Sequence, residues 1–240
     1  STGATIAAGQ LILGRIRGIK RPALCPAIPN IRGSYTLLCD CGANAECKPS
    51  MLCQFAVMAS AYATAGFGIK NPRVGLVNNG TEEHKGDPLH QQTYQLLKKM
   101  DVINFAGNIE GRDIMLSDCD VAVCDGFSGN IALKSMEGCG KLILSVLKKE
   151  ATSTLSSKIG SLFLMKGFKR MRSKLDFEAV GGALLLGVKK VVIKSHGSSK
   201  ARTITAAIEN AATIYSGNLV GRVEEMLSKV DWDNLIPKEE

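Results

Sequence analysis

The chain has 240 residues, a formal net charge of +8 and only 5% aromatic residues. This length suits one large α/β domain or two small ones, and the lack of an uninterrupted run of about 18 apolar residues excludes a membrane-spanning helix. The positive charge favours anionic partners, but the basic residues are not interleaved with aromatic ones, so we expect no nucleic-acid partner. Ser1 is not an initiator methionine and no secretory signal pattern follows it, so we expect this chain to lack a leading segment.

The eight cysteines argue for reduced thiols rather than for a metal site. No two of them form a C-x-x-C pair, and the spacing of the closest four does not match the usual zinc sites. These four are Cys39, Cys41, Cys47 and Cys53. Reduced cysteines are typical of the cytoplasm, where a buried thiol behaves as a small apolar group. We therefore expect a cytoplasmic protein without a metal.

Taken in chain order, short apolar runs alternate with segments of helical periodicity. The predicted strands are 23–28, 35–39, 74–77, 102–105, 120–124 and 191–194. The predicted helices are 6–16, 51–65, 88–99, 131–150 and 201–227. This repeated strand–helix order predicts an α/β fold with a mostly parallel sheet and helices on both faces.

Polar and glycine-rich loops follow several of these strands, at the position where open α/β sheets bind ligands. The loop Asp125–Asn130 leads into a helix, whose N-terminal N–H groups and dipole favour an anion such as phosphate. Similar N–H groups are expected at 1–4, where Ser1 or Thr2 can cap the first helix beside Gly3, and at 196–199. In the loop after 74–77, Lys85 is a candidate for contacting an anion, although a solvated lysine is the simpler alternative.

Other polar side chains have two open interpretations. Asn108, Glu110, Arg112 and Asp113 are predicted to lie in a loop, where they either form part of a site or serve locally, Asp113 as a helix cap and Glu110 as a solvent-exposed partner of Arg112. His196 is either a proton donor or a histidine that merely bonds a neighbouring carbonyl.

The segment 151–175 carries six basic residues and no acidic one. We expect it to be broken at Gly160 and Gly167, with an apolar tip at Leu162–Met165. Two interpretations are compatible with each other: a helical hairpin that packs in a bundle with a partner subunit, and an apolar tip that enters anionic lipid. We define the hairpin as 131–178.

Taken together, these motifs resemble the bacterial acyl-carrier-protein:phosphate acyltransferases of the PlsX type, over essentially the whole chain. The residues that carry the resemblance are Gly14–Ile19, Arg21–Leu24, Asp40, Gly42–Asn44, Lys48–Pro49, Asn71–Leu76, Gly80, Glu82, Lys85–Gly86, Asn104–Phe105, Gly107–Asp113, Asp125–Phe127, Gly129–Asn130, Gly181–Ala183 and His196–Ser199. The family's leading segment, with its own Gly-Gly-Asp motif, is absent here.

The resemblance implies that inorganic phosphate attacks the thioester of a fatty acyl carrier protein, giving acyl phosphate for a glycerol-3-phosphate acyltransferase in phospholipid synthesis. It also implies an isocitrate/isopropylmalate dehydrogenase-like fold in a single domain spanning 1–240, a homodimer, peripheral contact with the inner face of the plasma membrane, and no cofactor. The expected catalytic residues are Lys85, His196 and Asn44. The expected substrate-binding residues are Thr2, Gly3, Asn108, Glu110, Arg112, Asp125, Ser128, Asn130 and Ser198. The expected membrane contacts are Leu162, Phe163, Leu164 and Met165.

We expect the acidic carrier to bind a basic rim formed by Arg15, Arg17, Lys20 and Arg21. Three alternatives remain. The first is a phosphate acetyl- or butyryltransferase-like enzyme that uses acyl-CoA. The second is a dehydrogenase-like enzyme, which the lack of a G-x-G-x-x-G motif in a βαβ unit argues against. The third is a non-catalytic membrane-binding module, which would not explain the loops at the strand ends.

Overall fold

The computed structural model describes residues 2–174, 176 and 179–236. Its centre is a five-stranded sheet in the order β2-β3-β6-β4-β5. The strands are β2 (Ala27–Pro29), β3 (Tyr35–Cys39), β4 (Arg73–Asn78), β5 (Asn104–Glu110) and β6 (Val121–Val123). Only the β2–β3 pair is antiparallel, and the pairs β3–β6, β6–β4 and β4–β5 are parallel. The predicted mixed α/β fold with a largely parallel sheet is confirmed.

Alternate residues of the central strands face two different apolar cores. Leu37 and Val121 belong to the larger core, whereas their neighbours Leu38 and Ala122 belong to a second core on the opposite face of the sheet. Side chains of successive strand residues point to opposite faces, so a sheet buried on both faces needs apolar residues at every position. The continuous apolar runs of β3 and β6 meet this requirement.

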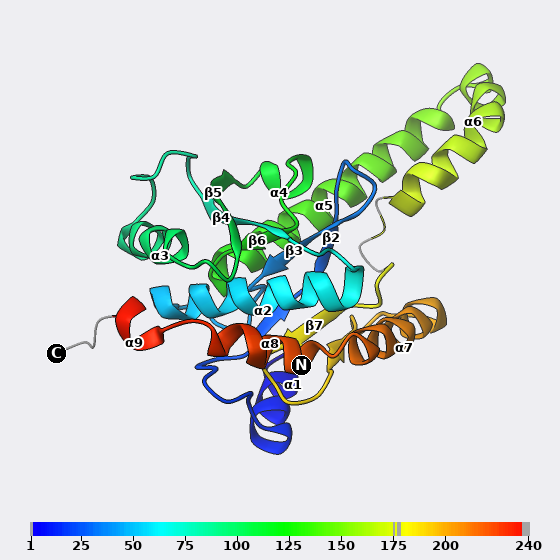
Figure 1. Ribbon diagram of the computed structural model, residues 1–240. Coiled ribbons are helices and arrows are strands. Elements are labelled where there is room, and N and C mark those ends of the chain that lie inside the picture. Colours follow the sequence, from blue (N-terminus) through cyan, green and yellow to red (C-terminus); the bar gives the residue numbers. More distant parts are fainter. Residues whose placement is uncertain (1, 175, 177–178, 237–240) are drawn as a thin grey trace.

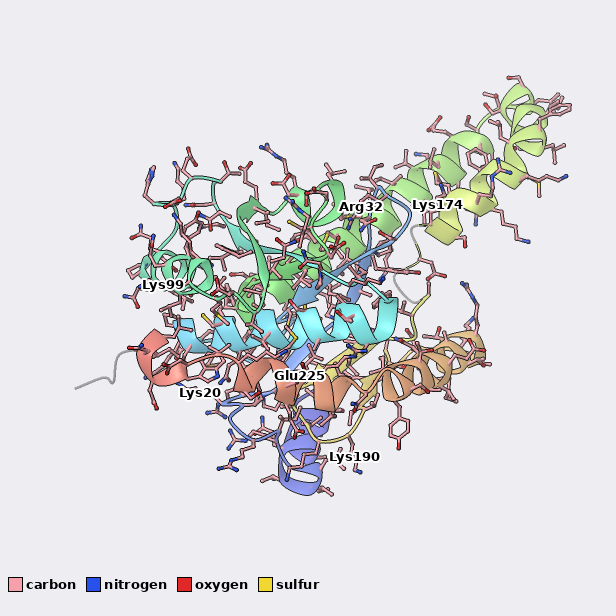
Figure 2. The ribbon with its side chains drawn as sticks, viewed as in Figure 1. Lys20, Arg32, Lys99, Lys174, Lys190 and Glu225 are labelled. Carbon is pink, nitrogen blue, oxygen red and sulfur yellow. The ribbon has the colours of Figure 1, made fainter. Side chains whose placement is uncertain are left out.

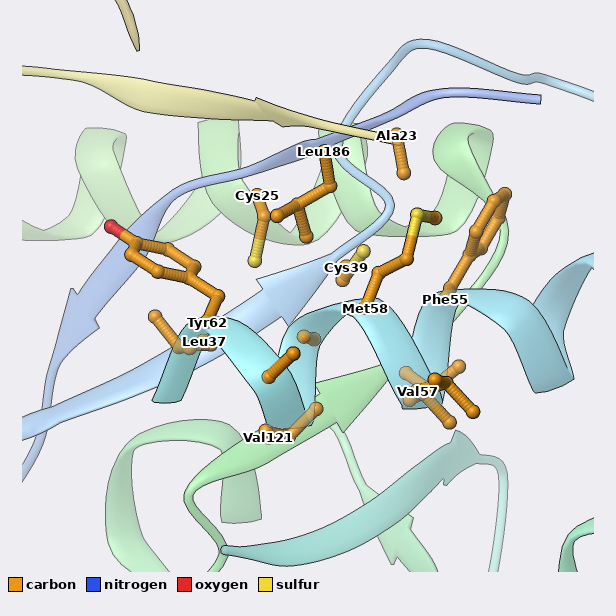
Figure 3. Close-up of a cluster of buried hydrophobic side chains, with 14 of the residues drawn as sticks. Ala23, Cys25, Leu37, Cys39, Phe55, Val57, Met58, Tyr62, Val121 and Leu186 are labelled. Atoms are coloured by element: carbon orange, nitrogen blue, oxygen red, sulfur yellow. The ribbon is translucent and has the colours of Figure 1, made fainter. Parts of the chain in front are cut away.

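Helix α2 (Pro49–Phe67) fills the larger core. It is apolar around its whole circumference, and 15 of its 19 residues are buried. A helix of this kind must be surrounded by protein. Its side chains contact Leu37 and Val121 of the five-stranded sheet, and Cys25 and Leu186 of a second sheet (Figure 3). Helices α7 (Ala201–Ser216) and α8 (Leu219–Ser228) cover it from outside, and α3 (Pro88–Lys98) also packs on it (Figure 1).

The second sheet is small and entirely antiparallel, in the order β1-β7-β8. Its strands are β1 (Ala23–Cys25), β7 (Ala183–Leu186) and β8 (Ile193–Lys194). The single strand predicted at 23–28 was therefore wrong: Pro26, which cannot donate a ladder hydrogen bond, separates two strands that belong to different sheets. The predicted strand 191–194 is shorter and does not join the main sheet.

Two long helices form the α5–α6 hairpin, which projects from the body of the molecule (Figure 1). Helix α5 spans Gly126–Ala151 and α6 spans Leu155–Lys174. The expected breaks at Gly160 and Gly167 are absent, because a helical glycine costs only about 1 kcal/mol relative to alanine. The turn of the hairpin lies at 152–154, so Leu162–Met165 lies within α6 rather than at the tip. Residues 175, 177 and 178 of the predicted hairpin lie outside the described residues.

The remaining elements are short. The chain opens with α1 (Thr2–Ala8) and one π-helical turn, η1 (Gly9–Leu13), where one regular helix was expected. Helix α4 (Asp113–Leu116) follows β5, and α9 (Trp232–Leu235) closes the described chain. The predicted helix 201–227 is interrupted at Gly217 and Asn218; a side chain on Gly217 would lie 2.4 Å from the Ala65 carbonyl oxygen of α2. Among the described helices, none combines the length and apolar composition needed to cross a bilayer.

Candidate active site

The carboxyl ends of the four parallel strands lie at one edge of the sheet, because all four run in the same direction. The loop with Asn44 follows β3, the loop with Lys85 follows β4, and Asp125 follows β6. Asn108 and Glu110 are the last polar side chains of β5. The fold therefore brings most of the predicted site residues to the same edge, although they come from four separate parts of the chain.

The β6–α5 loop differs from the predicted anion site in one respect. Asp125 is buried and caps α5: its Oδ1 accepts hydrogen bonds from the N–H groups of Phe127 (3.0 Å) and Ser128 (2.9 Å). The N–H of Gly126 donates to the Asn44 carbonyl, and that of Gly129 donates to the Asp125 carbonyl. These backbone donors therefore already have acceptors within the protein, which leaves them less available for phosphate than expected. A carboxylate of the protein occupies the position expected for the ligand.

Asp40 organises the neighbouring loop after β3. Its carboxylate accepts hydrogen bonds from the backbone of Leu24, Ala43 and Asn44 and from the Asn44 side chain. Burial raises the pKa of this carboxyl group, while the hydrogen bonds oppose the rise. The Asn44 amide donates to Asp40 Oδ2 (2.9 Å) and to the Pro22 carbonyl (2.8 Å). Both amide hydrogens are used within the protein, so the predicted role of Asn44 as a donor to substrate does not fit this geometry.

Ser128 and Asn130 present exposed side chains on the first turn of α5. The Asn130 carboxamide lies over Gly42: a Cβ built on this glycine would lie 3.5 Å from Asn130 Cγ. Gly42 also has a φ of +97°, which side-chain-bearing residues rarely adopt. The close contact joins the β3 and β6 loops and leaves the two side chains at the strand-end edge.

The β4–α3 loop, 79–87, holds Lys85. The carbonyl of Lys85 accepts a hydrogen bond from Asn78 Nδ2 (3.1 Å), and its N–H donates to the Glu82 carbonyl (3.1 Å). The aliphatic part of its side chain passes over Gly80, where an added Cβ would lie 3.0 Å from Lys85 Cγ. Within the described residues, no ion pair involves the Lys85 ammonium group, whereas Glu83 of the same loop is paired with Lys98.

The polar residues after Phe105 are only partly in a loop. Asn108 and Glu110 belong to β5, because this strand continues to residue 110 alongside β4. Glu110 and Arg112 form an ion pair, and Arg112 is largely exposed, as in the simpler of the two sequence interpretations. Asp113 Oδ2 accepts a hydrogen bond from the Glu110 N–H (2.9 Å), so it stabilises the turn rather than capping α4.

Asn108 is the one buried member of this group, with 6% of its surface exposed. Its Nδ2 donates to the Glu82 carbonyl in the Lys85 loop (2.8 Å). Its Oδ1 is buried and has no hydrogen-bond partner within the described structure. A buried carbonyl oxygen without a partner is unfavourable, so this atom is an unsatisfied acceptor beside the Lys85 loop.

His196 and Ser198 follow β8 of the small sheet, not a parallel strand. Both are exposed, and His196 Nδ1 lies 2.7 Å from Ser198 Oγ. Thr2 and Gly3 lie in α1, and the nearby Ile6 of that helix packs in one apolar cluster with Ala43. Ile6 thus places the first helix against the small sheet, because Leu24 and Leu185 of that cluster belong to β1 and β7. Ser1, the alternative cap, lies outside the described residues.

Two hollows of the described structure lie elsewhere. One, of about 490 Å³, is lined by residues 99–102 and by residues of 229–235, and the other, of about 380 Å³, lies beside it. The second is lined by Pro72, which precedes β4, and by Asn104, the first residue of β5. Both therefore adjoin the opposite edge of the sheet from Lys85.

Comparison with known proteins decides the family. The sequence pattern of the fatty acid synthesis protein family matches residues 1–222. This chain belongs to that family. Similar curated members are the proteins named phosphate acyltransferase from Clostridioides difficile (43% identical, covering 98% of this chain and 68% of that protein) and from Caldanaerobacter subterraneus (48%, 94% and 67%). The Helicobacter hepaticus protein of the same name is 47% identical, with 93% and 67% covered. The chain thus spans about two thirds of the length of these relatives.

Solved structures agree with the fold of this member of the fatty acid synthesis protein family. A phosphotransacetylase from Streptococcus pyogenes matches with a TM-score of 0.54 and 17% identity, covering 95% of this chain and 61% of that one. The EutD phosphotransacetylase from Staphylococcus aureus gives a TM-score of 0.56 and 18% identity, covering 91% and 60%. At this identity the likeness concerns the fold alone.

Sequence reasoning missed the residues that hold the site together in this family member. Asp40 was recognised as an acid at the end of a strand, but not as the acceptor that organises the loop. The hydrogen bonds that Asn78 and Gln91 donate to carbonyls of the Lys85 loop were not foreseen. An acid directly after a buried strand is a detectable signal, because such a carboxylate often accepts hydrogen bonds from the loop that follows. Gln91 gives no comparable signal: a glutamine on the surface of a helix is ordinary.

Proposed function

We propose that this chain transfers a fatty acyl group from acyl carrier protein to inorganic phosphate, producing acyl phosphate and free carrier protein for phospholipid synthesis. Membership of the fatty acid synthesis protein family and the relatives named phosphate acyltransferase support the reaction class. The structural observation that carries the proposal is the strand-end edge, where Lys85 is held on a hydrogen-bonded loop without a partner anion in the described structure.

The reaction needs an anion site and a donor for a developing oxyanion. A phosphate oxygen attacks the thioester carbonyl carbon, and the carbonyl electrons form an oxyanion. When this intermediate collapses, the carbon–sulfur bond breaks, and the carrier leaves as a thiolate that takes a proton from solvent. Phosphate is already anionic, so orientation and charge stabilisation are the main requirements. Lys85 stabilises the phosphate or the oxyanion, and Asn108 Oδ1 accepts a hydrogen bond from a protonated phosphate oxygen.

Other predicted residues take supporting roles in this proposal. Ser128 and Asn130 contact substrate from α5, and Arg112 adds positive charge beside Glu110. Thr2, Gly3, His196 and Ser198 contribute from the side of the small sheet, with His196 as a donor. Asn44 and Asp125 act by shaping the loops, because their polar atoms are bonded within the protein.

The carrier protein binds the basic rim in this proposal. Arg15, Arg17, Lys20 and Arg21 are all exposed. Their segment adjoins the strand-end edge, because the Asn44 side chain donates to the Pro22 carbonyl directly after it. An acidic carrier bound here would lie next to the loop after β3. Electrostatic attraction of this kind chiefly accelerates association and fixes orientation.

The α5–α6 hairpin is proposed to serve both assembly and membrane contact. Both helices carry large apolar side chains of which about half or more of the surface is exposed. Four of these residues, Leu162–Met165, are consecutive in α6 and lie among its basic residues. A second copy of the chain would cover one part of this apolar surface, and anionic lipid would take up another. We propose a cytoplasmic homodimer that rests on the inner face of the plasma membrane, where a glycerol-3-phosphate acyltransferase uses its product.

The test is direct formation of acyl phosphate. The purified protein is incubated with fatty acyl carrier protein and phosphate, and acyl phosphate is trapped with hydroxylamine and measured as the hydroxamate by mass spectrometry. We expect phosphate-dependent product together with free carrier. Product from acyl-CoA but not from the acyl carrier would favour the second candidate, an acetyl- or butyryltransferase-like enzyme, which the fold likeness to phosphotransacetylases supports. No product from either donor would contradict the proposal.

A further inference from the structure

The loop that carries Lys85 is held by side-chain amides. Asn108 Nδ2 donates to the Glu82 carbonyl (2.8 Å), and Asn78 Nδ2 donates to the Lys85 carbonyl (3.1 Å). Gln91 Nε2 donates to the carbonyls of His84 (2.8 Å) and Gly86 (2.9 Å). Four carbonyl groups of 82–86 therefore accept bonds from three amides, two of which come from strands β4 and β5 and one from helix α3.

Gln91 differs from the other two amides because its bonds flank the lysine. One amide nitrogen joins the carbonyls of His84 and Gly86, the residues directly before and after Lys85 in the chain. Gln91 lies on the first turn of α3, whose N-cap Asp87 accepts a hydrogen bond from the His90 N–H (2.9 Å). The base of Gln91 is therefore fixed by a capped helix rather than by the loop itself.

The local backbone leaves little space for an alternative loop conformation. Gly86 has a φ of +91°, and an added Cβ would lie 2.6 Å from Asn78 Oδ1 and 2.7 Å from His90 Cβ. On the other side, Gly80 lies beneath the Lys85 side chain. The Glu83–Lys98 ion pair ties the loop to α3 once more, but it is exposed and contributes little. The Gln91 bonds are exposed as well, but they hold the peptide groups directly beside Lys85, whereas the ion pair holds a side chain two residues away.

We infer that Gln91 is a positioning residue for the acyl transfer: its amide fixes the peptide groups on both sides of Lys85 and so holds the ammonium group toward the strand-end edge. This inference rests on the proposed function. A catalytic cation that is out of place by about 1 Å loses much of its effect, and without Gln91 the peptide groups beside Lys85 lose two hydrogen bonds. Removal of both bonds should lower turnover about tenfold.

The experiment compares Gln91→Met with Gln92→Met. Methionine keeps the length and helix propensity of glutamine but cannot donate. Gln92 is the adjacent exposed residue of the same helix, and no hydrogen bond of its side chain is found in the described structure. We expect Gln91→Met to lower kcat about tenfold while Gln92→Met stays within twofold of the unaltered protein. Equal activity of the two variants would overturn the inference.

A double-substitution cycle tests whether Gln91 acts through Lys85. In a Lys85→Ala background, Gln91→Met should cause no further loss beyond about twofold, because the group that it positions is gone. If Gln91→Met lowers turnover by the same factor in both backgrounds, Gln91 acts elsewhere and the inference is wrong.

Amide hydrogen exchange tests whether the Gln91 hydrogen bonds restrain the Lys85 loop, independently of the proposed function. Peptides covering 79–87 should exchange faster in Gln91→Met than in Gln92→Met, and those covering α2 should not change. If the loop exchanges faster in Gln91→Met but the unaltered protein forms no acyl phosphate, Gln91 restrains the loop but the proposed function is wrong. The positioning role in acyl transfer would then be wrong as well. Unchanged exchange at 79–87 would overturn the inference whatever the activity.

Discussion

At the scale of single residues, the hydrogen bonds separate side chains that build the site from those that remain available. Asp40, Asn44 and Asp125 use their polar atoms on neighbouring backbone groups. Lys85 is different, since its backbone is bonded while its ammonium group has no ion-pair partner in the described structure. An unpaired cation on a fixed loop is the kind of group that a reaction between anions requires.

The first prediction concerns this lysine. Lys85→Ala should lower acyl phosphate formation by about 100-fold or more, because it removes the charge that stabilises phosphate or the oxyanion. The measurement is the hydroxamate assay at saturating substrates. Lys99→Ala, at an exposed lysine after α3, is the control and should have little effect. Near-normal turnover of Lys85→Ala would remove it from the mechanism.

Residue types were easier to predict than their roles. The sequence pointed to the loops with Asn44, Lys85 and Asp125, because acids, amides and glycines after buried strands form a local signal. It could not show that Asp125 caps its own helix rather than leaving the N–H groups to an anion, since both uses need the same residues. The unpartnered Oδ1 of Asn108 depends on packing between β5 and the Lys85 loop, which no local pattern reports.

At the scale of elements, the junction between α5 and the β3 loop is the tightest contact near the site. A Cβ on Gly129 would lie 2.0 Å from the Asp40 carbonyl oxygen and 2.7 Å from Cys124 Sγ. Gly129 is buried in α5, where a glycine would otherwise be unfavourable. The helix therefore approaches the loop as closely as the absence of a side chain permits.

The second prediction follows from this contact. Gly129→Ala should reduce the free energy of unfolding by about 2–3 kcal/mol, because the backbone of Asp40 must shift to admit the methyl group. Gly138→Ala is the matched control in the same helix, since nothing lies within 4 Å of its added Cβ. We expect it to raise the free energy of unfolding by about 0.5–1 kcal/mol. Urea denaturation of both variants makes the comparison, and an unaffected Gly129→Ala would contradict the packing described here.

Elements with a strong local pattern were predicted well, and those that depend on distant partners were not. Helices α2 and α3 and strands β3 and β4 lie close to their predicted positions. The split of 23–28 between two sheets depends on β7, which lies more than 150 residues later in the chain. Asn108 and Glu110 belong to β5 through pairing with β4, which resumes after a shift in register at Gly107, where φ is +95°.

At the scale of the whole molecule, the hairpin is the most exposed apolar part. Figure 2 shows its side chains projecting away from the body on both helices. Phe163 is 85% exposed, and Lys158, Lys166, Lys169 and Arg170 of the same helix are exposed around it. This combination of an apolar group and surrounding cations is typical of helices that bind anionic membranes.

The third prediction tests this surface. The double substitution Leu162→Ser and Phe163→Ser should reduce co-sedimentation with vesicles containing anionic phospholipid by at least about fivefold, because it removes two side chains that lipid would bury. Ile208→Ser is the control: it removes an exposed apolar residue of α7, outside the hairpin. Sedimentation velocity run in parallel would show whether the double variant instead changes the oligomeric state. Unchanged vesicle binding would contradict the membrane role of these residues.

Composition indicated that the segment 151–175 is basic and amphipathic, but not its shape. The expected glycine breaks would have placed Leu162–Met165 at a tip, whereas α6 is continuous and these residues lie around its circumference. A glycine interrupts a helix only where the helix propensity of the neighbouring residues does not compensate for its own unfavourable propensity. The leucines, methionines and lysines around Gly160 and Gly167 have high helix propensity, so the helix continues.

The surroundings of α2 have a consequence for the synthesis of the chain. This helix ends at Phe67, yet α7 and α8, which cover its outer side, do not begin until Ala201 and Leu219. During translation this apolar helix therefore leaves the ribosome long before α7 and α8, the helices that bury it, have been synthesised. Until then α2 can associate with apolar surfaces of other polypeptides. The strands that precede it in the chain cover only part of its surface. Chaperone dependence during translation would follow from this late cover, and not from any weakness of the finished protein.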